Sequence, residues 1–107
     1  MNHLIYICIL GLKYLDLSNN QLAALPEALN ELNALEYLSL HSNNLRSLPS
    51  LVSRCVYLTY LDVSNNVLRE VPESLEEMLS LTYLDASRNR ITHLPYSIGD
   101  CKKVGYS

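Results

Sequence analysis

Leucine, tyrosine, asparagine and proline recur along this chain at a constant interval of 23 residues. The interval holds without a gap through four consecutive copies, which makes chance agreement implausible and indicates an internal repeat. The repeated positions are Leu12, Leu35, Leu58 and Leu81; Tyr14, Tyr37, Tyr60 and Tyr83; Asn20, Asn43, Asn66 and Asn89; and Pro26, Pro49, Pro72 and Pro95. The chain therefore divides into four units, residues 12–34, 35–57, 58–80 and 81–103.

Each unit predicts one short strand. In Leu15-Asp16-Leu17 apolar and polar residues alternate with a period of two, so a strand would place both leucines on one face. The same alternation recurs at 38–40, 61–63 and 84–86. Because one unit cannot bury its apolar edge alone, we expect neighbouring units to stack, with parallel strands about 4.8 Å apart.

The second half of each unit predicts a short helix or 3₁₀ turn on the opposite side. Proline has a fixed φ and no N–H, which suits the point where the chain leaves the sheet. Beyond it, apolar residues recur in pairs three positions apart, a spacing that places both on one side of a helical turn. These pairs are Leu29 and Leu32, Val52 and Cys55, Leu75 and Met78, and Ile98 and Cys101. A sheet on one side and helical turns on the other would curve the stack into an arc.

The asparagine of each unit lies where the chain leaves the predicted strand and turns. An amide side chain there can satisfy main-chain groups of its own unit and of the next unit, forming a ladder along the stack. We interpret Asn20, Asn43, Asn66 and Asn89 as this structural ladder, with Asn44 facing solvent.

Each unit reads L-x-Y-L-x-(L/V/A)-x-x-N-x-(L/I) and then reaches a Leu-Pro or Val-Pro pair. This pattern resembles the leucine-rich repeat in its 23-residue form, LxxLxLxxNxLxxLPxxLxxLxx, and is similar to the intracellular repeats of Ras-suppressor and scribble-type scaffold proteins. The resemblance implies an α/β solenoid with a concave parallel sheet, and a non-enzymatic protein that binds a partner protein on that face. It also implies scaffolding in signalling, around a small GTPase or in cell polarity.

The two ends of the chain fit the repeat less well. Within residues 1–11, positions 4–9 copy the start of a unit, and residues 104–107 begin a fifth unit and stop. Solenoids need polar caps on their terminal units, and neither segment supplies one. We therefore interpret the chain as a piece of a longer array, a truncated product or a domain capped by a partner. Because an uncovered edge strand is a template for pairing, we expect the isolated chain to self-associate or aggregate through an end. The apolar run is too short for a membrane span and lacks the basic start of a signal peptide.

Composition sharpens this picture. The chain has 107 residues, enough for one small domain, and contains 23 leucines but no Phe and no Trp. A net charge of −3 argues against a nucleic-acid binder. Three cysteines form no disulfide framework, and we expect Cys55 and Cys101 to be buried free thiols two units apart. Without a glycosylation sequon either, the sequence favours the cytoplasm.

The outward-facing strand positions are the candidate binding surface. Four tyrosines at one position of the pleat would stack along the sheet, and tyrosine is also enriched in binding hot spots. Stacking alone would explain them, but an exposed aromatic column favours use by a partner. Beside the tyrosines runs a column of aspartates, Asp16, Asp62 and Asp85, which Ser39 interrupts. We see no need for acids at these positions in folding. They therefore favour a partner with a basic surface. The predicted contact residues are Tyr14, Tyr37, Tyr60, Tyr83, Asp16, Asp62, Asp85, His41 and Arg88.

The sequence offers no support for catalysis, a cofactor or a metal site. Asp62, Ser64 and His41 lie on a regular open sheet without oxyanion donors, and the Cys and His residues lack metal-ligand spacing. Three alternatives to a scaffold remain open at this stage. They are the repeat segment of a larger multidomain signalling enzyme, an extracellular receptor ectodomain, and an assembly piece whose ends make the contacts.

Overall fold

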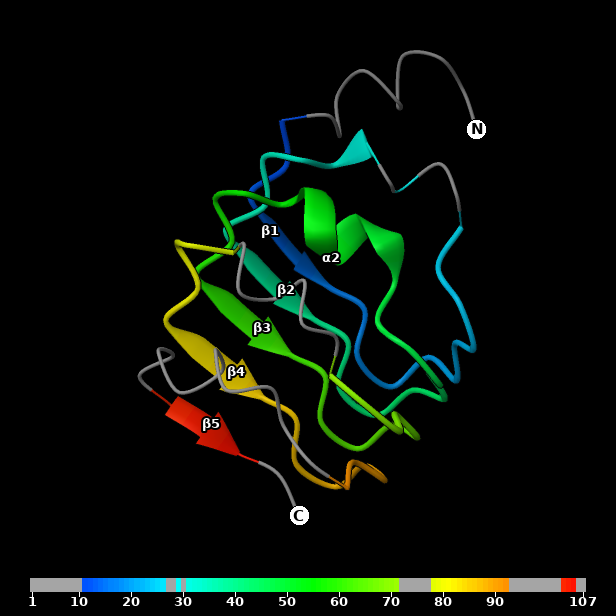
Figure 1. The fold of residues 1–107 in the computed structure, drawn as a ribbon. Helices are drawn as coiled ribbons and strands as arrows, with labels where there is room; N and C mark the ends of the chain where they lie inside the picture. Colours follow the sequence, from blue (N-terminus) through cyan, green and yellow to red (C-terminus); the bar gives the residue numbers. More distant parts are fainter. Residues whose placement is uncertain (1–10, 27–28, 30, 72–77, 93–102, 106–107) are drawn as a thin grey trace.

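The computed structural model describes residues 11–26, 29, 31–71, 78–92 and 103–105. Five parallel strands follow one another in chain order across a single sheet (Figure 1). The strands are β1 (Tyr14–Asp16), β2 (Tyr37–Ser39), β3 (Tyr60–Asp62), β4 (Tyr83–Asp85) and β5 (Lys103–Gly105). The leucine-rich-repeat solenoid expected from the sequence is confirmed.

The units stack in the register that the 23-residue interval predicts. Tyr14 pairs with Tyr37, Tyr37 with Tyr60, and Tyr60 with Tyr83. The strands begin one residue before the predicted segments, but the parallel hydrogen bonding continues past their ends. The Leu17 N–H donates to the Ser39 carbonyl at 2.9 Å, and Leu40 N–H donates to the Asp62 carbonyl at 2.7 Å.

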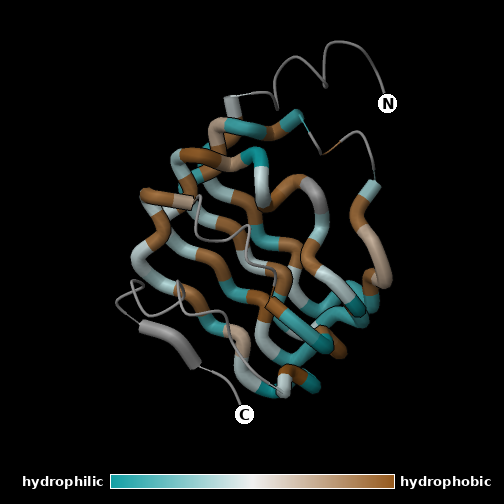
Figure 2. Tube along the Cα trace, in the orientation of Figure 1, coloured by the Kyte–Doolittle hydropathy of each residue, from teal (hydrophilic) through white to brown (hydrophobic). Residues whose placement is uncertain are grey.

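The core lies behind the sheet, where the two apolar residues of each strand segment point. In the second and third units these are Leu38, Leu40, Leu61 and Val63, all fully buried. Figure 2 shows the resulting alternation of hydrophobic and polar colour along the strands. Full burial of one such aliphatic side chain contributes about 2 kcal/mol. The leucine excess is therefore a consequence of one packing problem repeated along the stack.

Helical turns cover the other side of this core. Helix α2 (Ser50–Arg54) begins after Pro49 (Figure 1). Its Leu51 and Val52 are buried, as is Cys55, the residue that caps its C-terminal end. In the first unit the Leu32 N–H donates to the Leu29 carbonyl at 3.1 Å, an i to i+3 bond of the 3₁₀ type. Met78 is buried in the third unit. The predicted inward positions Leu75, Ile98 and Cys101 lie outside the described residues.

The fifth strand departs from the repeat interval. Lys103, and not the tyrosine 23 positions after Tyr83, pairs with Tyr83 across β4 and β5. The step into β5 is thus three residues shorter than the other steps. Residues 1–10, and with them the predicted copy of a repeat start at 4–9, lie outside the described residues.

Candidate functional site

A ladder of four stacked tyrosines runs across the sheet on the face opposite the core. The ring centroids of Tyr14 and Tyr37 are 4.0 Å apart, those of Tyr37 and Tyr60 4.3 Å, and those of Tyr60 and Tyr83 4.4 Å. Adjacent planes differ by no more than 9°. The strand pairing sets this spacing, because equal positions of neighbouring parallel strands lie about 4.8 Å apart. The structure therefore contains the stacked tyrosine ladder, and we call the sheet face that bears it the tyrosine face.

The rings cover one another without being removed from the surface. Tyr14 at the end of the ladder is 59% exposed, and the other three rings are half-buried. The pKa of the Tyr37 hydroxyl is raised above its usual range, mainly by hydrogen bonding with Tyr14 and to a lesser extent by removal from water. The pKa of Tyr60 is raised mainly by removal of its hydroxyl from water and to a lesser extent by the negative charge of Asp62. At neutral pH the two central tyrosines, Tyr37 and Tyr60, are therefore uncharged.

The aspartates beside the ladder stabilise the turns that follow the strands. Asp62 Oδ1 accepts hydrogen bonds from the Ser64 N–H at 2.9 Å and from the Ser64 hydroxyl at 2.6 Å. Asp85 makes the same two bonds with Ser87, at 3.0 and 2.6 Å. The acids thus have a structural role that the sequence pattern did not indicate, because each carboxylate closes a local turn with the serine two residues on.

Asp16 belongs to the same set of turns. Its Oδ1 accepts a hydrogen bond from the Ser18 N–H at 2.9 Å. Hydrogen bonding with Ser18 holds the pKa of Asp16 below its usual value, with a small contribution from the charge of His41. Each of the three aspartates lies two residues after a tyrosine of the ladder and therefore on the same face of the sheet.

His41 is linked to the third unit through a serine. Its Nδ1 lies 2.7 Å from the Ser64 hydroxyl oxygen, and that hydroxyl donates to Asp62. Since the single proton of the hydroxyl goes to the carboxylate, the imidazole must donate through Nδ1–H. A nucleophilic serine requires the reverse arrangement, in which the imidazole accepts the hydroxyl proton. The hydrogen-bonded series His41–Ser64–Asp62, in which Ser64 is buried, therefore links two neighbouring units and is not arranged to activate the serine.

The residue after the outward serine or histidine of each unit adopts a left-handed backbone conformation. Positive φ values between 54° and 60° occur there in all four units. Asparagine tolerates this conformation better than most residues, whereas serine and arginine do so at a cost. The four residues are Asn19, Ser42, Asn65 and Arg88. The predicted contact residue Arg88 thus lies in an exposed bend beyond β4, not on the strand beside the tyrosines.

The asparagine ladder joins each unit to the one before it. Asn43 Nδ2 donates to the carbonyls of Leu17 and Leu40, both at 3.0 Å, and its Oδ1 accepts from the N–H groups of Asn20 and Leu22. Asn66 and Asn89 repeat the pattern 23 residues on. We expected each asparagine to bond to its own unit and to the next unit. Its bonds between units instead go to the preceding unit, because the side chain points back along the stack.

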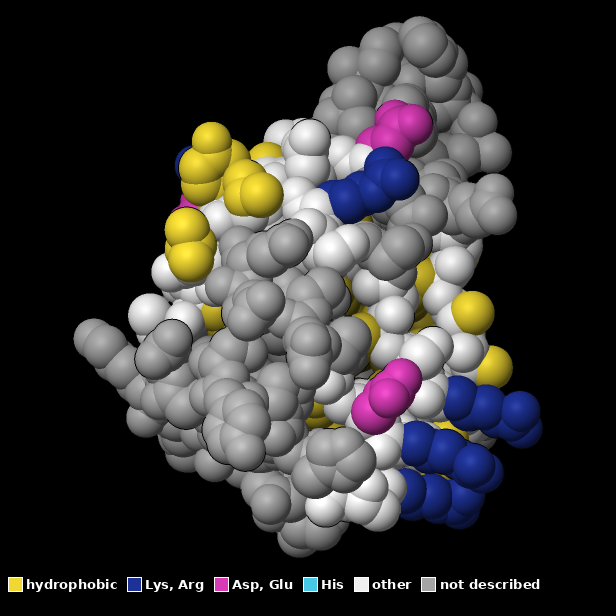
Figure 3. Space-filling model, viewed as in Figure 1, with side chains coloured by type: hydrophobic (Ala, Val, Ile, Leu, Met, Phe, Trp, Pro, Cys, Tyr) yellow, Lys and Arg dark blue, Asp and Glu magenta, His cyan; other side chains and the backbone are white. Residues whose placement is uncertain are grey.

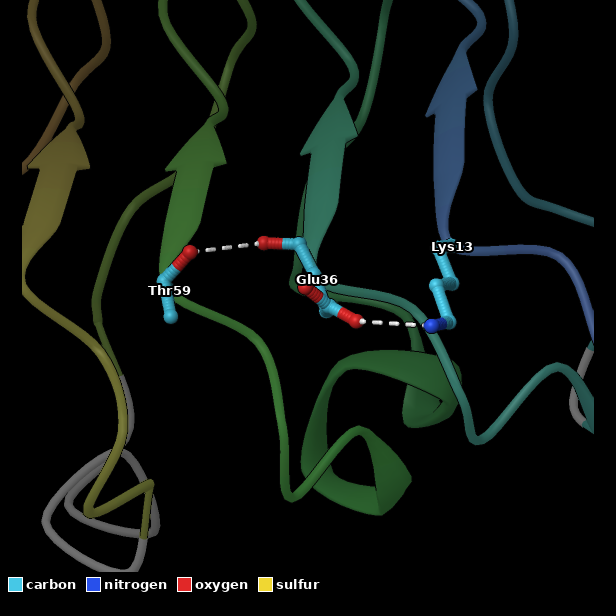
Figure 4. Close-up of polar contacts among 3 residues, drawn as sticks. All are labelled: Lys13, Glu36 and Thr59. Atoms are coloured by element: carbon cyan, nitrogen blue, oxygen red, sulfur yellow. Dashed lines mark hydrogen bonds and ion pairs between the residues drawn. The ribbon is translucent and has the colours of Figure 1, made fainter.

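A polar row at the start of the strands was not found from the sequence. The Thr59 hydroxyl donates to the Glu36 carbonyl at 3.0 Å, and Lys13 Nζ lies 3.8 Å from a Glu36 carboxylate oxygen (Figure 4). Thr82 repeats the threonine bond to the Thr59 carbonyl at 3.2 Å. The signal was present in the 23-residue interval of these residues. Since Lys13 and Glu36 are exposed, this ion pair adds little stability.

Neither redox chemistry nor metal binding is indicated in the part of the chain that the structure describes. Cys55 is a buried free thiol that donates to the Leu51 carbonyl at 3.2 Å, and burial raises its pKa to about 11. It is therefore protonated and unreactive at neutral pH. Among these residues no cluster of His, Cys, Asp and Glu could hold a metal ion. Nor do they include a helix long and apolar enough to cross a membrane.

Family comparison agrees with this architecture. The leucine-rich-repeat family in its two-copy form matches residues 11–53, and the single leucine-rich repeat matches residues 57–78 and 80–101. The chain belongs to the leucine-rich-repeat proteins, whose repeats generally mediate protein–protein interaction. No curated protein sequence gives a significant match.

Solved structures of similar fold come from larger proteins. A leucine-rich-repeat protein of Leptospira interrogans superposes with a TM-score of 0.73 at 28% identity over 86% of this chain and 25% of that one. The internalin inlF of Listeria monocytogenes gives 0.72 at 24% identity over 90% of this chain and 27% of that one. TLR13 in complex with ssRNA13 gives 0.63 at 31% identity over 77% and 12%. The chain thus spans about a quarter or less of each of these proteins.

Proposed function

We propose that this chain is a non-enzymatic module that binds a partner protein on its tyrosine face. The observation that supports this most directly is the stacked ladder of Tyr14, Tyr37, Tyr60 and Tyr83, which lies opposite a fully buried leucine core. Stacked rings offer a large, rigid aromatic area at low entropic cost, and their hydroxyls remain available for hydrogen bonds. A face of this kind favours protein contact.

The chemistry of the partner follows from the residues beside the ladder. Asp16, Asp62 and Asp85 form an acidic column next to the rings, which favours a partner surface with Lys or Arg side chains. The similar TLR13 structure contains an RNA, but the tyrosine and aspartate columns of this chain contain no basic side chain. A protein partner fits this face better than a phosphate backbone.

The cellular setting is part of the same proposal. A reduced, buried Cys55 and a sequence without glycosylation sequons support the cytoplasm. The resemblance to scaffold repeats supports a role in intracellular signalling, with a small GTPase as one partner class. Because the chain covers only part of each similar protein, recruitment within a larger signalling enzyme or receptor is the alternative assignment.

The test is affinity capture from cell lysate with matched tyrosine variants. Tyr37→Ala with Tyr60→Ala removes the centre of the ladder, while Tyr57→Ala removes a ring that is 64% exposed and lies outside it. We expect the ladder variant to lose bound proteins that wild type and Tyr57→Ala retain, with unchanged circular dichroism. Equal retention by all three proteins would contradict binding on the tyrosine face. Asp62 is left intact because its carboxylate closes a turn.

A further inference from the structure

The turns that follow β2, β3 and β4 form a positively charged hollow. It has a volume of about 450 Å³ and is lined by Arg46, Val67, Arg69 and Arg90. Figure 3 shows Lys and Arg side chains gathered at this edge of the molecule, at the lower right, over the turns that carry the chain away from the sheet. We call it the arginine hollow.

Main-chain hydrogen bonds hold the three arginines in register. The Val67 N–H donates to the Leu45 carbonyl at 3.0 Å, and the Arg90 N–H donates to the Leu68 carbonyl at 2.8 Å. Arg46 and Arg69 are 23 residues apart and so occupy equal positions in adjacent units. Arg90 occupies the position of Val67 one unit further on. Three consecutive units thus each contribute one guanidinium group, over a span of about 10 Å.

These charges are not used within the described part of the molecule. The ion pair among the described residues joins Lys13 and Glu36, and no described carboxylate pairs with Arg46, Arg69 or Arg90, although Glu70 is next to Arg69 in sequence. All three arginines are exposed. Three positive charges this close repel one another, and a negatively charged group bound between them would offset that repulsion.

Folding does not require arginine at these positions. The residues equivalent to Arg46 and Arg69 are Ala23 in the first unit and Thr92 in the fourth. The main-chain bond that joins neighbouring units here also forms beside Ala23, where the Asn44 N–H donates to the Leu22 carbonyl at 2.8 Å. The cluster is also unusual in a chain whose net charge is −3. Its position on the turns separates it from the acidic column of the tyrosine face.

We propose that the arginine hollow binds an acidic segment of a partner protein. Guanidinium groups pair with carboxylates through two parallel N–H···O bonds, which gives such contacts direction as well as strength. In an extended segment, side chains two residues apart point the same way and lie about 6.7 Å apart. Two or three Asp or Glu side chains spaced in this way would reach the guanidinium groups, while Val67 supplies an apolar contact between them.

The test measures binding of labelled peptides to the full chain by fluorescence anisotropy. The probes are a peptide in which Glu and Ser alternate, the same peptide with Gln in place of Glu, this Gln peptide with phosphoserine in place of Ser, and a single-stranded RNA oligonucleotide. The protein variants are Arg46→Gln with Arg69→Gln and Arg90→Gln, the single Arg69→Gln, and Arg54→Gln. Arg54 is an exposed arginine of α2 that does not line the hollow, so it is the matched control.

We expect the Glu peptide to bind and the Gln peptide not to bind, with affinity falling as salt rises. The triple variant should bind about tenfold more weakly, because each exposed charge pair contributes roughly a factor of two. Arg69→Gln should give an intermediate loss and Arg54→Gln none, with equal melting temperatures throughout. An equal loss in Arg54→Gln, no binding of the Glu peptide, or tighter binding of the phosphopeptide or the RNA would overturn the proposal.

Discussion

The first unit and the second unit share a sequence pattern, yet the structure gives their equivalent residues different surroundings. Leu15 and Leu17 are half-buried, whereas Leu38 and Leu40 are fully buried. The asparagines differ in the same way: Asn20 is exposed and its side chain donates to carbonyls of its own unit, while Asn43 is 6% exposed and its side chain bonds to two units. Among the described residues, the first unit is covered from one side and the second from both.

This comparison shows that the repeat motif does not by itself fix the contribution of a residue. In a solenoid, stability is close to a sum of unit terms and nearest-neighbour interface terms. A leucine that faces two neighbours takes part in two interfaces, and a leucine that faces one takes part in one. Equivalent substitutions in the first unit and in an inner unit, the second or the third, should therefore have unequal effects, which makes the comparison testable.

The largest difference is expected in the core. Leu61→Ala should lower the free energy of unfolding by about 3 kcal/mol, because it opens a cavity between two packed units. Leu15→Ala should cost about 1 kcal/mol, since this side chain is already partly in contact with water. Urea denaturation of the two variants measures both values. Equal midpoints would mean that the first unit is as well covered as the third.

The asparagine ladder should show a smaller difference of the same kind. Asn43→Ala leaves the Leu22 N–H and the carbonyls of Leu17 and Leu40 without this partner and should cost about 2 kcal/mol. Asn20→Ala should cost about 0.5 kcal/mol, because water can replace its exposed bonds. Asn44→Ala serves as the control, since Asn44 is exposed and its side chain donates to the Gln21 carbonyl at a long distance of 3.4 Å. If Asn43→Ala and Asn44→Ala unfold at the same temperature, the ladder does not stabilise the stack.

The smallest effect concerns the turn of the first unit. Gln21 has a φ of 56°, while its equivalents Asn44, Val67 and Arg90 are not in the left-handed region. Asparagine accepts this conformation more readily than glutamine, so Gln21→Asn should raise stability by about 0.5 kcal/mol. The reverse exchange, Asn44→Gln, should leave the melting temperature unchanged, because no such constraint exists there. If Gln21→Asn does not raise the stability, or lowers it, the turn of the first unit is not strained in the way proposed here.

The periodic part of the structure could be predicted from the sequence because a fixed interval places equal residues side by side. This accounts for the parallel strands, the buried leucines and the stacking of Tyr14 on Tyr37. The last step into β5 could not be predicted, because its pairing of Tyr83 with Lys103 departs from the interval. Periodicity says which residues are equivalent, but not where the repeat stops applying.

The repeat interval predicts which residues lie side by side, but it does not predict the hydrogen bonds that their side chains make. The position of Asp62 beside the tyrosines was evident, but its bonds to Ser64 depend on a turn geometry that the pattern does not contain. The direction of the Asn43 bonds likewise depends on which way the side chain points along the stack. The arginine hollow combines two different repeat positions, Arg46 with Arg69 and then Arg90, so reading each column separately does not reveal it.

The backward direction of the asparagine bonds has a consequence for the order in which the chain matures during synthesis. The turn of the first unit, at Leu17 and Leu22, receives its partners from Asn43, which leaves the ribosome more than twenty residues later. Each unit is therefore completed by its successor, and the most recently made turn always waits for the residues that follow. During synthesis, the turn of a unit therefore lacks these hydrogen bonds until the asparagine of the following unit has been made.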